Sequence, residues 1–592
     1  MKTLRRTTAL LLSLLLVLAA AGCAASPEQE QAQFDAFLAE ELADVLESDY
    51  LSMHVLAFDP QVYGVDRENV AVSLGERDIL QAKADAREGI KASLKKLKSF
   101  SRAKLTPEQQ DAYDIYLFYL EAQQQLAQKK FDYFGDTFSD VGEYTQLPTL
   151  FADYRFYSER DIADLITLIW DTRDYMGGQI EFIKLQQQKG TLSLDCDTVL
   201  EYCQGIVQEG EQSAVLSSMQ ESIKAMGLDA GQEQEYLSQL KEAFLSSFLP
   251  AYQDIIDAVE ELKAQGAGIK PLADMPNGKK YYEALLQYNI GTTTPIKEFT
   301  AQMEEALEAQ LGDLYTVLSK EGVIERYMET GLDVSTEYTD FTKMLGDLEQ
   351  KIGEHFPSVG KVDYTIEAIA PALAVETIGA YFNIPTLDGG EPELIKVNTT
   401  STSSSISSLE TFMTVAHEGF PGHLYQYAYM RKNLADQPLL QVITLSGYTE
   451  GYAKYIESLA AQYAGVDADL VELYCANALC SGYITVLADI GIHYEAWSKE
   501  QVRDFMEDYG LDEQYFEDAY NQMANNPGIF LPYFGGQMEF AKMRAKAEQA
   551  MGDDFDEIAF HDLILRYGGP SFDFLNQKLE QYLQQQGQQA AA

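Results

Sequence analysis

The stretch His-Glu-Gly-Phe-Pro-Gly-His, residues 417–423, decides how the rest of this 592-residue chain is interpreted. A His-Glu pair followed closely by a second His is how many hydrolases hold zinc beside a general base. The usual metalloprotease helix places its histidines four residues apart, whereas His417 and His423 are six apart. At about 100° per residue, six helical steps turn the second side chain roughly 120° away from the first. Either the helix breaks between the two histidines or they do not share a metal.

The residues between the histidines favour a break. Pro421 has no N–H to give to a helical ladder, and Gly422 can adopt backbone angles closed to other residues. The Pro-Gly pair can therefore swing His423 back toward His417, and we expect both side chains to point at one spot. The alternative is a helix that ends near Phe420, with His423 a surface residue of the next element.

Two neutral histidines need a third protein ligand if zinc is to keep one open position. Glu450, within Gly-Tyr-Thr-Glu-Gly-Tyr at 447–452, opens a strongly patterned helix 27 residues after His423. That interval is long enough for a loop through 433–438 and a return helix. Glu450 is therefore the candidate for the third ligand.

The first 23 residues have the features of an export signal. A charged start containing Arg5 and Arg6 precedes the apolar run Ala9–Ala21, which is shorter than the roughly 20 residues of a membrane span. The run leads through Ala-Ala-Gly to Cys23, which resembles the lipobox of bacterial lipoproteins. We expect Cys23 to be the lipidated anchor of an exported protein that faces outward from the cell membrane. Simple secretion is the alternative, because Ala20 replaces the usual Leu.

Composition describes a folded and strongly acidic body. The chain has 43 Lys and Arg against 93 Asp and Glu, a net charge of −50, and such a surface repels the phosphate backbone of nucleic acids. Hydrophobic residues make up 46% and can supply a large core. We expect no membrane span after the signal. The four later cysteines do not have the spacing of a disulfide framework or a zinc site, and we expect buried free thiols.

The organisation is expected to be mainly α. Apolar residues recur at three- and four-residue steps over 107–131, 162–185, 232–264, 295–318 and 466–488. One short region, Val362–Ile366 and Leu394–Val397, alternates like strands and precedes a helix that starts near Leu409. Such a strand could offer its backbone to an extended peptide or only buttress the helix. The turn at Pro276–Gly278 predicts an N-terminal helical half, 24–275, and a catalytic half, 276–592.

With Glu450 added, the chain resembles the glutamate-zincins, which carry a His-Glu pair, a second His and then a Glu on a following helix. Within that group it is most similar to the bacterial family known as domain of unknown function 885. The resemblance covers most of the chain after residue 23, and the Pro-Gly between the histidines belongs to the family's pattern. Tyr452 departs from it, since Trp is expected there. The matching segments are Thr414–Gln426, Glu450–Tyr455, Asp489–His493, Pro527, Tyr533, Arg544 and Phe560–Asp562.

The resemblance implies a large helical bundle of glutamate-zincin type, with a deep central cleft and a small β element beside the metal-binding helix. It implies that Zn²⁺ is held by His417, His423 and Glu450. Glu418 would take a proton from water and pass it to the leaving amine.

Four further residues are candidates for supporting roles. The resemblance implies that a Tyr or His from late in the chain stabilises the oxyanion, and His493 and Tyr533 are the candidates. Glu457 follows Glu450 by seven residues on the same helix face and is a candidate partner of a metal ligand. The alternatives are ordinary core residues for the first two and a solvated carboxylate for Glu457. Arg544 could receive a substrate carboxylate or form a surface salt bridge.

We therefore expect a zinc-dependent peptidase that acts on short peptides, since the helical relatives enclose their zinc in a narrow channel. One rival is hydrolysis of a non-peptide amide or ester by the same residues. Another is a lipoprotein that binds peptides or other solutes without cutting them. Glu418 argues against the second rival, because binding alone needs no general base.

Overall fold

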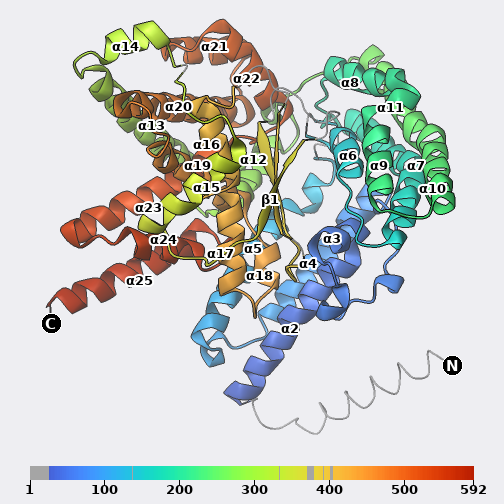
Figure 1. Ribbon diagram of the computed structural model, residues 1–592, viewed down its shortest axis with the longest axis horizontal. Helices are drawn as coiled ribbons and strands as arrows, with labels where there is room; N and C mark the ends of the chain where they lie inside the picture. Colours follow the sequence, from blue (N-terminus) through green and yellow to red (C-terminus); the bar gives the residue numbers. More distant parts are fainter. Residues whose placement is uncertain are drawn as a thin grey trace.

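The computed structural model describes residues 26–135, 138–139, 141–332, 334–369, 379–390, 392–399 and 405–591. The predicted export segment, including Cys23, lies outside these residues. Figure 1 shows a small sheet near the middle of the molecule, between N-terminal helices on the right and C-terminal helices on the left. The fold is mainly α, as predicted.

The N-terminal half consists of amphipathic helices joined by short turns. Its α-helices are α2 (Pro27–Ser48), α3 (Tyr50–Leu56), α4 (Ile79–Leu97), α5 (Pro107–Leu126), α6 (Glu143–Ala152), α7 (Glu159–Lys189), α8 (Cys196–Glu209), α9 (Ala214–Ala225), α10 (Ala230–Ala243) and α11 (Leu249–Ala264). Its shorter turns are η1 (Pro60–Tyr63), η2 (Arg67–Asn69), η3 (Arg102–Lys104), η4 (Lys129–Phe131), η5 (Gly210–Gln212), η6 (Phe244–Phe248) and η7 (Leu272–Asp274).

The C-terminal half is also helical and carries the sheet. Its α-helices are α12 (Gly278–Leu286), α13 (Ile296–Leu318), α14 (Val323–Thr330), α15 (Phe341–Lys351), α16 (Leu409–Glu418), α17 (His423–Asn433), α18 (Leu439–Val442), α19 (Ser446–Ala461), α20 (Ala468–Ile490), α21 (Lys499–Asp508), α22 (Glu513–Asn525), α23 (Gly536–Met551), α24 (Glu557–Leu565) and α25 (Phe572–Ala591). Its shorter turns are η8 (Gln287–Gly291), η9 (Ile352–Glu354), η10 (Gly491–Glu495), η11 (Leu531–Gly535) and η12 (Gly552–Asp554).

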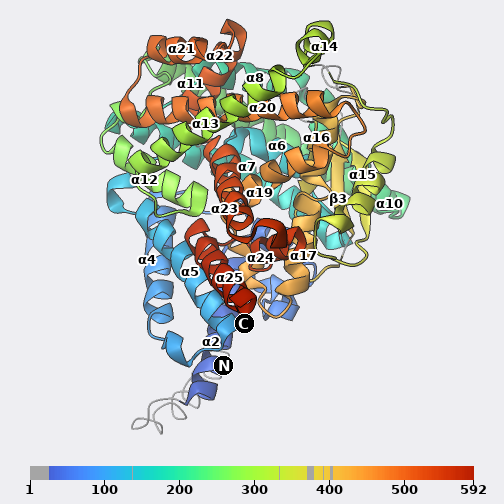
Figure 2. The ribbon, with the colours of Figure 1, turned by 90° about the vertical axis from the view of Figure 1, so that its left-hand side faces the viewer.

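The predicted helical segments are helical, with shifted ends. The predicted segment 232–264 is interrupted by the π-helical turn η6 between α10 and α11. α20, together with η10, is long and apolar enough to span a membrane, which differs from the expectation from sequence. However, 61% of its most apolar window is buried inside the protein, and α20 packs closely on α13 (Figure 2). We therefore interpret α20 as a core helix.

The sheet has the strand order β1-β3-β2. β1 (Tyr364–Ala368) pairs in parallel with β3 (Glu393–Val397), and these are the two strands that the sequence predicted. β2 (Ala380–Asn383), which was not predicted, pairs antiparallel with β3, lies at the edge of the sheet that the described residues form, and contacts α16. This edge strand lies beside the helix that carries the His-Glu pair.

The N-terminal half holds the sheet in place. Asp153, just after α6, accepts hydrogen bonds from Lys396 of β3 at 2.6 Å and from the hydroxyl of Tyr381 of β2. Beyond β2, the N–H of Leu387 donates to the carbonyl of Leu56 at 2.8 Å. The position of β2 relative to α16 therefore depends on both halves. Cys196, Cys203, Cys475 and Cys480 are free and buried, as expected.

Candidate metal centre

The two histidines stand on either side of a helix break. His417 and Glu418 are the last two residues of α16, and His423 is the first residue of α17. The chain turns through Gly419–Gly422, and the Phe420–Pro421 peptide bond is cis. The predicted break at Pro421 is confirmed, and the alternative in which His423 lies on the surface is excluded because the residue is only 9% exposed.

Local sequence explains where α16 begins and how the turn closes. Ser408 caps α16 by accepting a hydrogen bond from the N–H of Thr411 at 3.0 Å, as the predicted start near Leu409 requires. After the turn, the N–H of Gly422 donates to the carbonyl of Ala416 at 3.0 Å. A Cβ at Gly422 would collide with the carbonyl oxygens of His417 and Ala416, so only glycine fits there.

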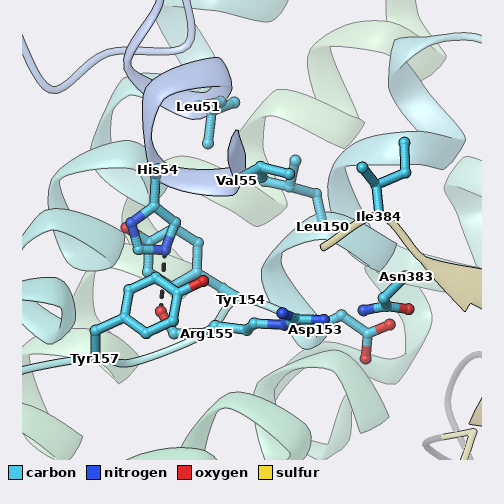
Figure 3. Close-up of a pocket in the computed structure, with 10 residues that line it drawn as sticks. All are labelled: Leu51, His54, Val55, Leu150, Asp153, Tyr154, Arg155, Tyr157, Asn383 and Ile384. Carbon is cyan, nitrogen blue, oxygen red and sulfur yellow. Dashed lines mark hydrogen bonds between the residues drawn. The ribbon is translucent and has the colours of Figure 1, made fainter. Parts of the chain in front are cut away.

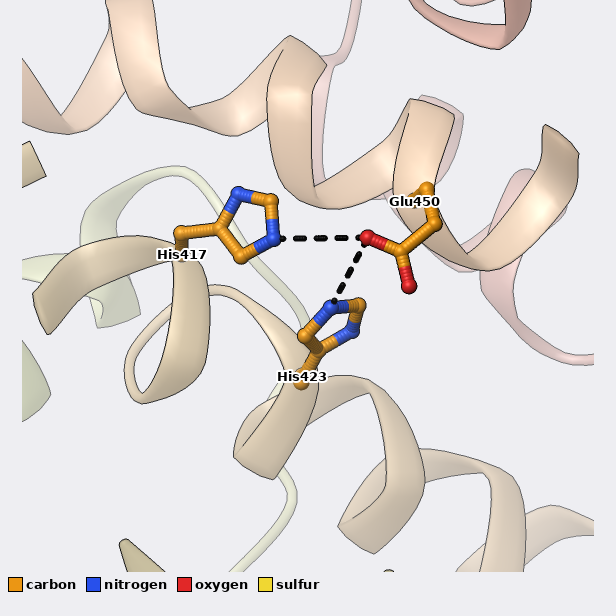
Figure 4. A group of neighbouring side chains, drawn as sticks. All are labelled: His417, His423 and Glu450. Atoms are coloured by element: carbon orange, nitrogen blue, oxygen red, sulfur yellow. Dashed lines mark ion pairs between the residues drawn. The ribbon is translucent and has the colours of Figure 1, made fainter. Parts of the chain in front are cut away.

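Glu450, on α19, completes a group of three converging side chains. Its Oε2 lies 3.6 Å from Nε2 of His417 and 3.5 Å from Nε2 of His423 (Figure 4). One candidate ligand atom from each residue lies within 4.8 Å of the others. A tetrahedral zinc ion with bonds of 2.0–2.2 Å separates its ligand atoms by about 3.3 Å. The three residues therefore fit one metal ion with modest adjustment.

Glu457 lies behind His417. Its Oε1 accepts a hydrogen bond from Nδ1 of His417 at 2.8 Å, which leaves Nε2 directed at Glu450. Lys454 in turn donates to Glu457 Oε2 at 2.8 Å. Burial lowers the pKa of His417, but its hydrogen bonds to Glu450 and Glu457 outweigh burial and raise the pKa to about 10. Glu457 is therefore a buried hydrogen-bond partner of His417, and the solvated alternative is excluded.

Gln426 supports the second histidine. Its Oε1 lies 3.3 Å from Nδ1 of His423, one helical turn along α17. Sequence reasoning placed Gln426 in the matching segment but gave it no role. The available signal was its spacing, because a residue three positions after His423 lies beside it on the helix.

Glu418 lies outside the group of three and is held by the sheet. Its Oε2 accepts a hydrogen bond from the N–H of Phe382, on the outer edge of β2, at 2.8 Å. The side chain is half-buried at the end of α16. A carboxylate that is fixed beside the histidines but is not one of the three converging groups is placed to exchange protons there.

Tyr533 lies in the turn η11, which packs against α19, the helix that carries Glu450. The two elements come close because glycines face each other: a Cβ at Gly451 would collide with Gly536, and one at Gly536 with the carbonyl of Gly447. Burial and the charges of Glu450 and Glu418 hold the pKa of Tyr533 well above its usual value. The hydroxyl therefore stays protonated and can donate a hydrogen bond.

His493 is not available as an oxyanion donor, which corrects the expectation from sequence. Its Nδ1 accepts a hydrogen bond from the N–H of Leu272 at 3.1 Å, and its Nε2 donates to the carbonyl of Met523 at 2.8 Å. The side chain is fully buried, and burial lowers its pKa to about 4. With both ring nitrogens bound to backbone, His493 is a neutral structural residue.

Arg544 forms internal ion pairs. It donates to Glu557 at 2.6 Å and to the hydroxyl of Tyr455 at 3.0 Å. Tyr455 also lies 3.1 Å from Nε2 of His561, and His355 binds Glu557 at 2.6 Å. These contacts favour the interpretation of Arg544 as a salt-bridge residue. Together, the hydrogen bonds and ion pairs of Arg544, Tyr455 and Glu557 link α19, α23 and α24.

Comparison with known proteins places this geometry in context. A family model described as "Bacterial protein of unknown function (DUF885)" matches residues 75–579. The crystal structure of the "putative lipoprotein from Colwellia psychrerythraea" is 18% identical, with a TM-score of 0.80 over 95% of this chain and 100% of the other. A "putative lipoprotein of unknown function from Shewanella oneidensis" is 16% identical, with a TM-score of 0.59 over 94% and 99%. No curated protein matches the chain. At these identities the two structures establish a shared fold.

Proposed function

The chain belongs to the DUF885 family of bacterial proteins, and on that premise we propose that it is a zinc-dependent hydrolase that cuts short peptides. The observation that carries the proposal is the convergence of His417, His423 and Glu450 beside a fourth residue, Glu418, whose carboxylate is held apart from them. Three ligands and one open position is the arrangement of catalytic rather than structural zinc. A solute-binding protein has no need of the fourth residue.

Different residues have different roles in the proposed reaction. A zinc ion bound by the three ligands supplies a Lewis acid that polarises a carbonyl and makes water acidic near neutral pH. Glu418 takes the proton from water and returns it to the leaving amine, and the Phe382 N–H keeps its carboxylate in position. Tyr533, protonated beside Glu450 and Glu418, donates a hydrogen bond to the developing oxyanion.

The outer edge of β2 favours a peptide over another amide or an ester. Phe382 and Ala380 direct their backbone groups away from β3, because the neighbouring Gly379 carbonyl is the one that accepts from Asn398, just after β3. The N–H of Phe382 is bonded to Glu418, so a peptide would pair with the Phe382 carbonyl and with the backbone of Ala380. An extended peptide can pair with such an edge and present its own amide beside Glu418. The same chemistry on a smaller substrate would make no use of the strand.

We also propose a glutamate-zincin-like architecture, in which the halves 24–275 and 276–592 flank a cleft that leads to the metal. Cys23 is proposed as a lipid anchor that keeps the enzyme on the outer face of the cell membrane. The lipobox-like residues before Cys23 support this, as does the description of both structural relatives as lipoproteins.

Metal content and peptide cleavage test the proposal together. Protein purified without chelator should hold zinc near one per chain, and His417→Ala should lose it. The wild type should cut a peptide library read by mass spectrometry, whereas Glu418→Gln should keep the metal and lose at least 100-fold in rate. Glu410→Gln is the matched control, because Glu410 is an exposed carboxylate on the same helix. Absence of zinc, or cleavage that survives Glu418→Gln, would refute the mechanism.

A further inference from the structure

A cavity lies where the N-terminal half meets the end of β2. It encloses about 240 Å³ between α3, the loop that follows α6, and the residues after β2 (Figure 3). The lining is mainly apolar, with Leu51, Val55 and Leu150 on one side and the rings of His54, Tyr154 and Tyr157 on the other. An apolar cavity of about 150 Å³ is enough to hold benzene. This cavity therefore has room for one large side chain.

The mouth of the cavity is apolar and open to solvent. Val55 is 43% exposed and Ile384 is 46% exposed, and both line the cavity. Phe58, 45% exposed, packs edge to face on Tyr157 with 5.1 Å between ring centroids. Exposed apolar side chains gathered at the rim of a cavity mark a binding site more often than an accident of the surface.

Two charged residues, Asp153 and Arg155, line the cavity. Asp153 is paired with Lys396 at 2.6 Å. His54 donates to the carbonyl of Arg155 at 3.0 Å and stacks on Tyr154 with ring centroids 4.3 Å apart. Burial lowers the pKa of His54 to about 4, so the ring is neutral. These contacts hold the walls in place, and the apolar residues Leu51, Val55 and Leu150 suit them to an apolar side chain.

β2 connects this cavity to the proposed catalytic residues. The N–H of Phe382 holds Glu418, and the next two residues, Asn383 and Ile384, line the cavity. Successive side chains of a strand point to opposite faces, so Asn383 shares a face with Tyr381, which reaches Asp153 in the N-terminal half. A peptide paired with the outer edge of β2 also alternates. Every second side chain is therefore directed to the cavity side of the sheet.

We propose that this cavity is the specificity pocket of the enzyme and receives one large apolar side chain, aromatic or leucine-like, of the peptide substrate. The inference rests on the proposed peptidase function. Because the pocket and Glu418 are both fixed to β2, the selected side chain stands at one constant position relative to the cleaved bond.

The test fills the pocket at its mouth. In Val55→Trp a large ring occupies the entrance, whereas Val62→Trp adds the same ring at a site on η1 that is 66% exposed and lines none of the described cavities. The substrates are a parent peptide made only of Ala, Ser and Gly and a series of peptides in which one Phe replaces each position of the parent in turn. Cleavage by the wild type and both variants is measured, and so is peptide binding to Glu418→Gln with and without each tryptophan.

We expect the wild type to favour Phe at one position by 10- to 200-fold in kcat/KM, roughly what one apolar pocket can supply. Val55→Trp should abolish that preference, so that the Phe peptides and the parent peptide are cut at similar rates, whereas Val62→Trp, outside the pocket, should cut every peptide at the wild-type rate. Absence of a positional preference, or a preference that survives Val55→Trp, overturns the pocket. If no peptide is cut, the proposed function fails, and the binding measurements test the pocket separately. Tighter binding of one Phe peptide than of the parent peptide, lost when Val55→Trp is added to Glu418→Gln, supports the pocket. Equal binding of the Phe peptides and the parent peptide overturns it.

Discussion

Each of the two histidines has a second residue behind it. Glu457 binds Nδ1 of His417 and Gln426 binds Nδ1 of His423, so both rings are fixed with Nε2 turned toward Glu450. Such partners set the tautomer and orientation of a ligand and raise its basicity. The orientation of the two rings therefore depends on residues outside the group of three.

Replacing Glu457 by Gln should weaken zinc binding by about 10- to 100-fold while the fold is retained, because the His417 ring loses its anionic partner. Competition with a chromophoric chelator measures the affinity. Glu260→Gln, an exposed carboxylate on α11, should bind zinc like the wild type. Equal affinities in all three proteins would show that Glu457 has no part in orienting the ligand.

Replacing Tyr533 by Phe should lower kcat by roughly 10²- to 10³-fold, with KM and zinc content nearly unchanged. The hydroxyl lies near the charges of Glu450 and Glu418, and its hydrogen bond is needed only when negative charge develops on the substrate. Steady-state kinetics with a cleaved peptide separates the two constants. A variant with wild-type kcat would remove Tyr533 from the reaction.

Some residues and contacts of the candidate metal centre could be predicted from the sequence, and others could not. His417, His423 and Glu450 could be found because their chemistry and spacing are visible in the sequence. The Phe382 contact could not, because a backbone N–H carries no sequence signal. His493 was misjudged for a related reason: the sequence does not reveal that Leu272 and Met523 bring their backbone groups to both sides of its ring.

Among the elements, the break between α16 and α17 determines whether the two histidines can meet. Gly422 allows the turn to fold back onto the last carbonyl groups of α16, and the hydroxyl of Tyr452 secures the turn by donating to the carbonyl of Pro421 at 2.8 Å. Proline and glycine made this break predictable. β2 was not predictable, because it is only four residues long and owes its strand form to pairing with β3.

Gly422→Ala should destroy the metal site, because the added methyl group collides with the carbonyl oxygens of His417 and Ala416. We expect zinc content to fall to less than about a tenth of the wild-type value, together with a destabilisation of more than about 2 kcal/mol. Elemental analysis and thermal unfolding measure the two effects. Gly346→Ala is the control: it lies in α15 with open space around it and should keep its zinc. A folded Gly422→Ala protein with full zinc would contradict the role given to the turn.

At the scale of the whole molecule, buried polar groups join segments that are far apart in the chain. His493, in η10, joins Leu272 of η7 to Met523 of α22. Next to it, Asp489 accepts hydrogen bonds from the hydroxyl of Tyr282 and from the N–H of Gly528. The mainly helical class followed from apolar periodicity, but these long-range bonds join residues far apart in the chain. No local pattern could have predicted them.

The buried His493 predicts how stability changes with pH. Burial lowers its pKa from about 6.5 to about 4, so the folded protein keeps the ring neutral where the unfolded chain would protonate it. Its contribution is complete above pH 6.5 and is lost as the pH falls toward 4, at no more than about 1.4 kcal/mol per pH unit. His493→Gln retains a donor and an acceptor but does not titrate. The melting temperature of the wild type should therefore exceed that of the variant most at pH 7 to 8, and the difference should shrink steadily between pH 6.5 and 4. A constant difference across this range would mean that His493 is not held neutral by the fold.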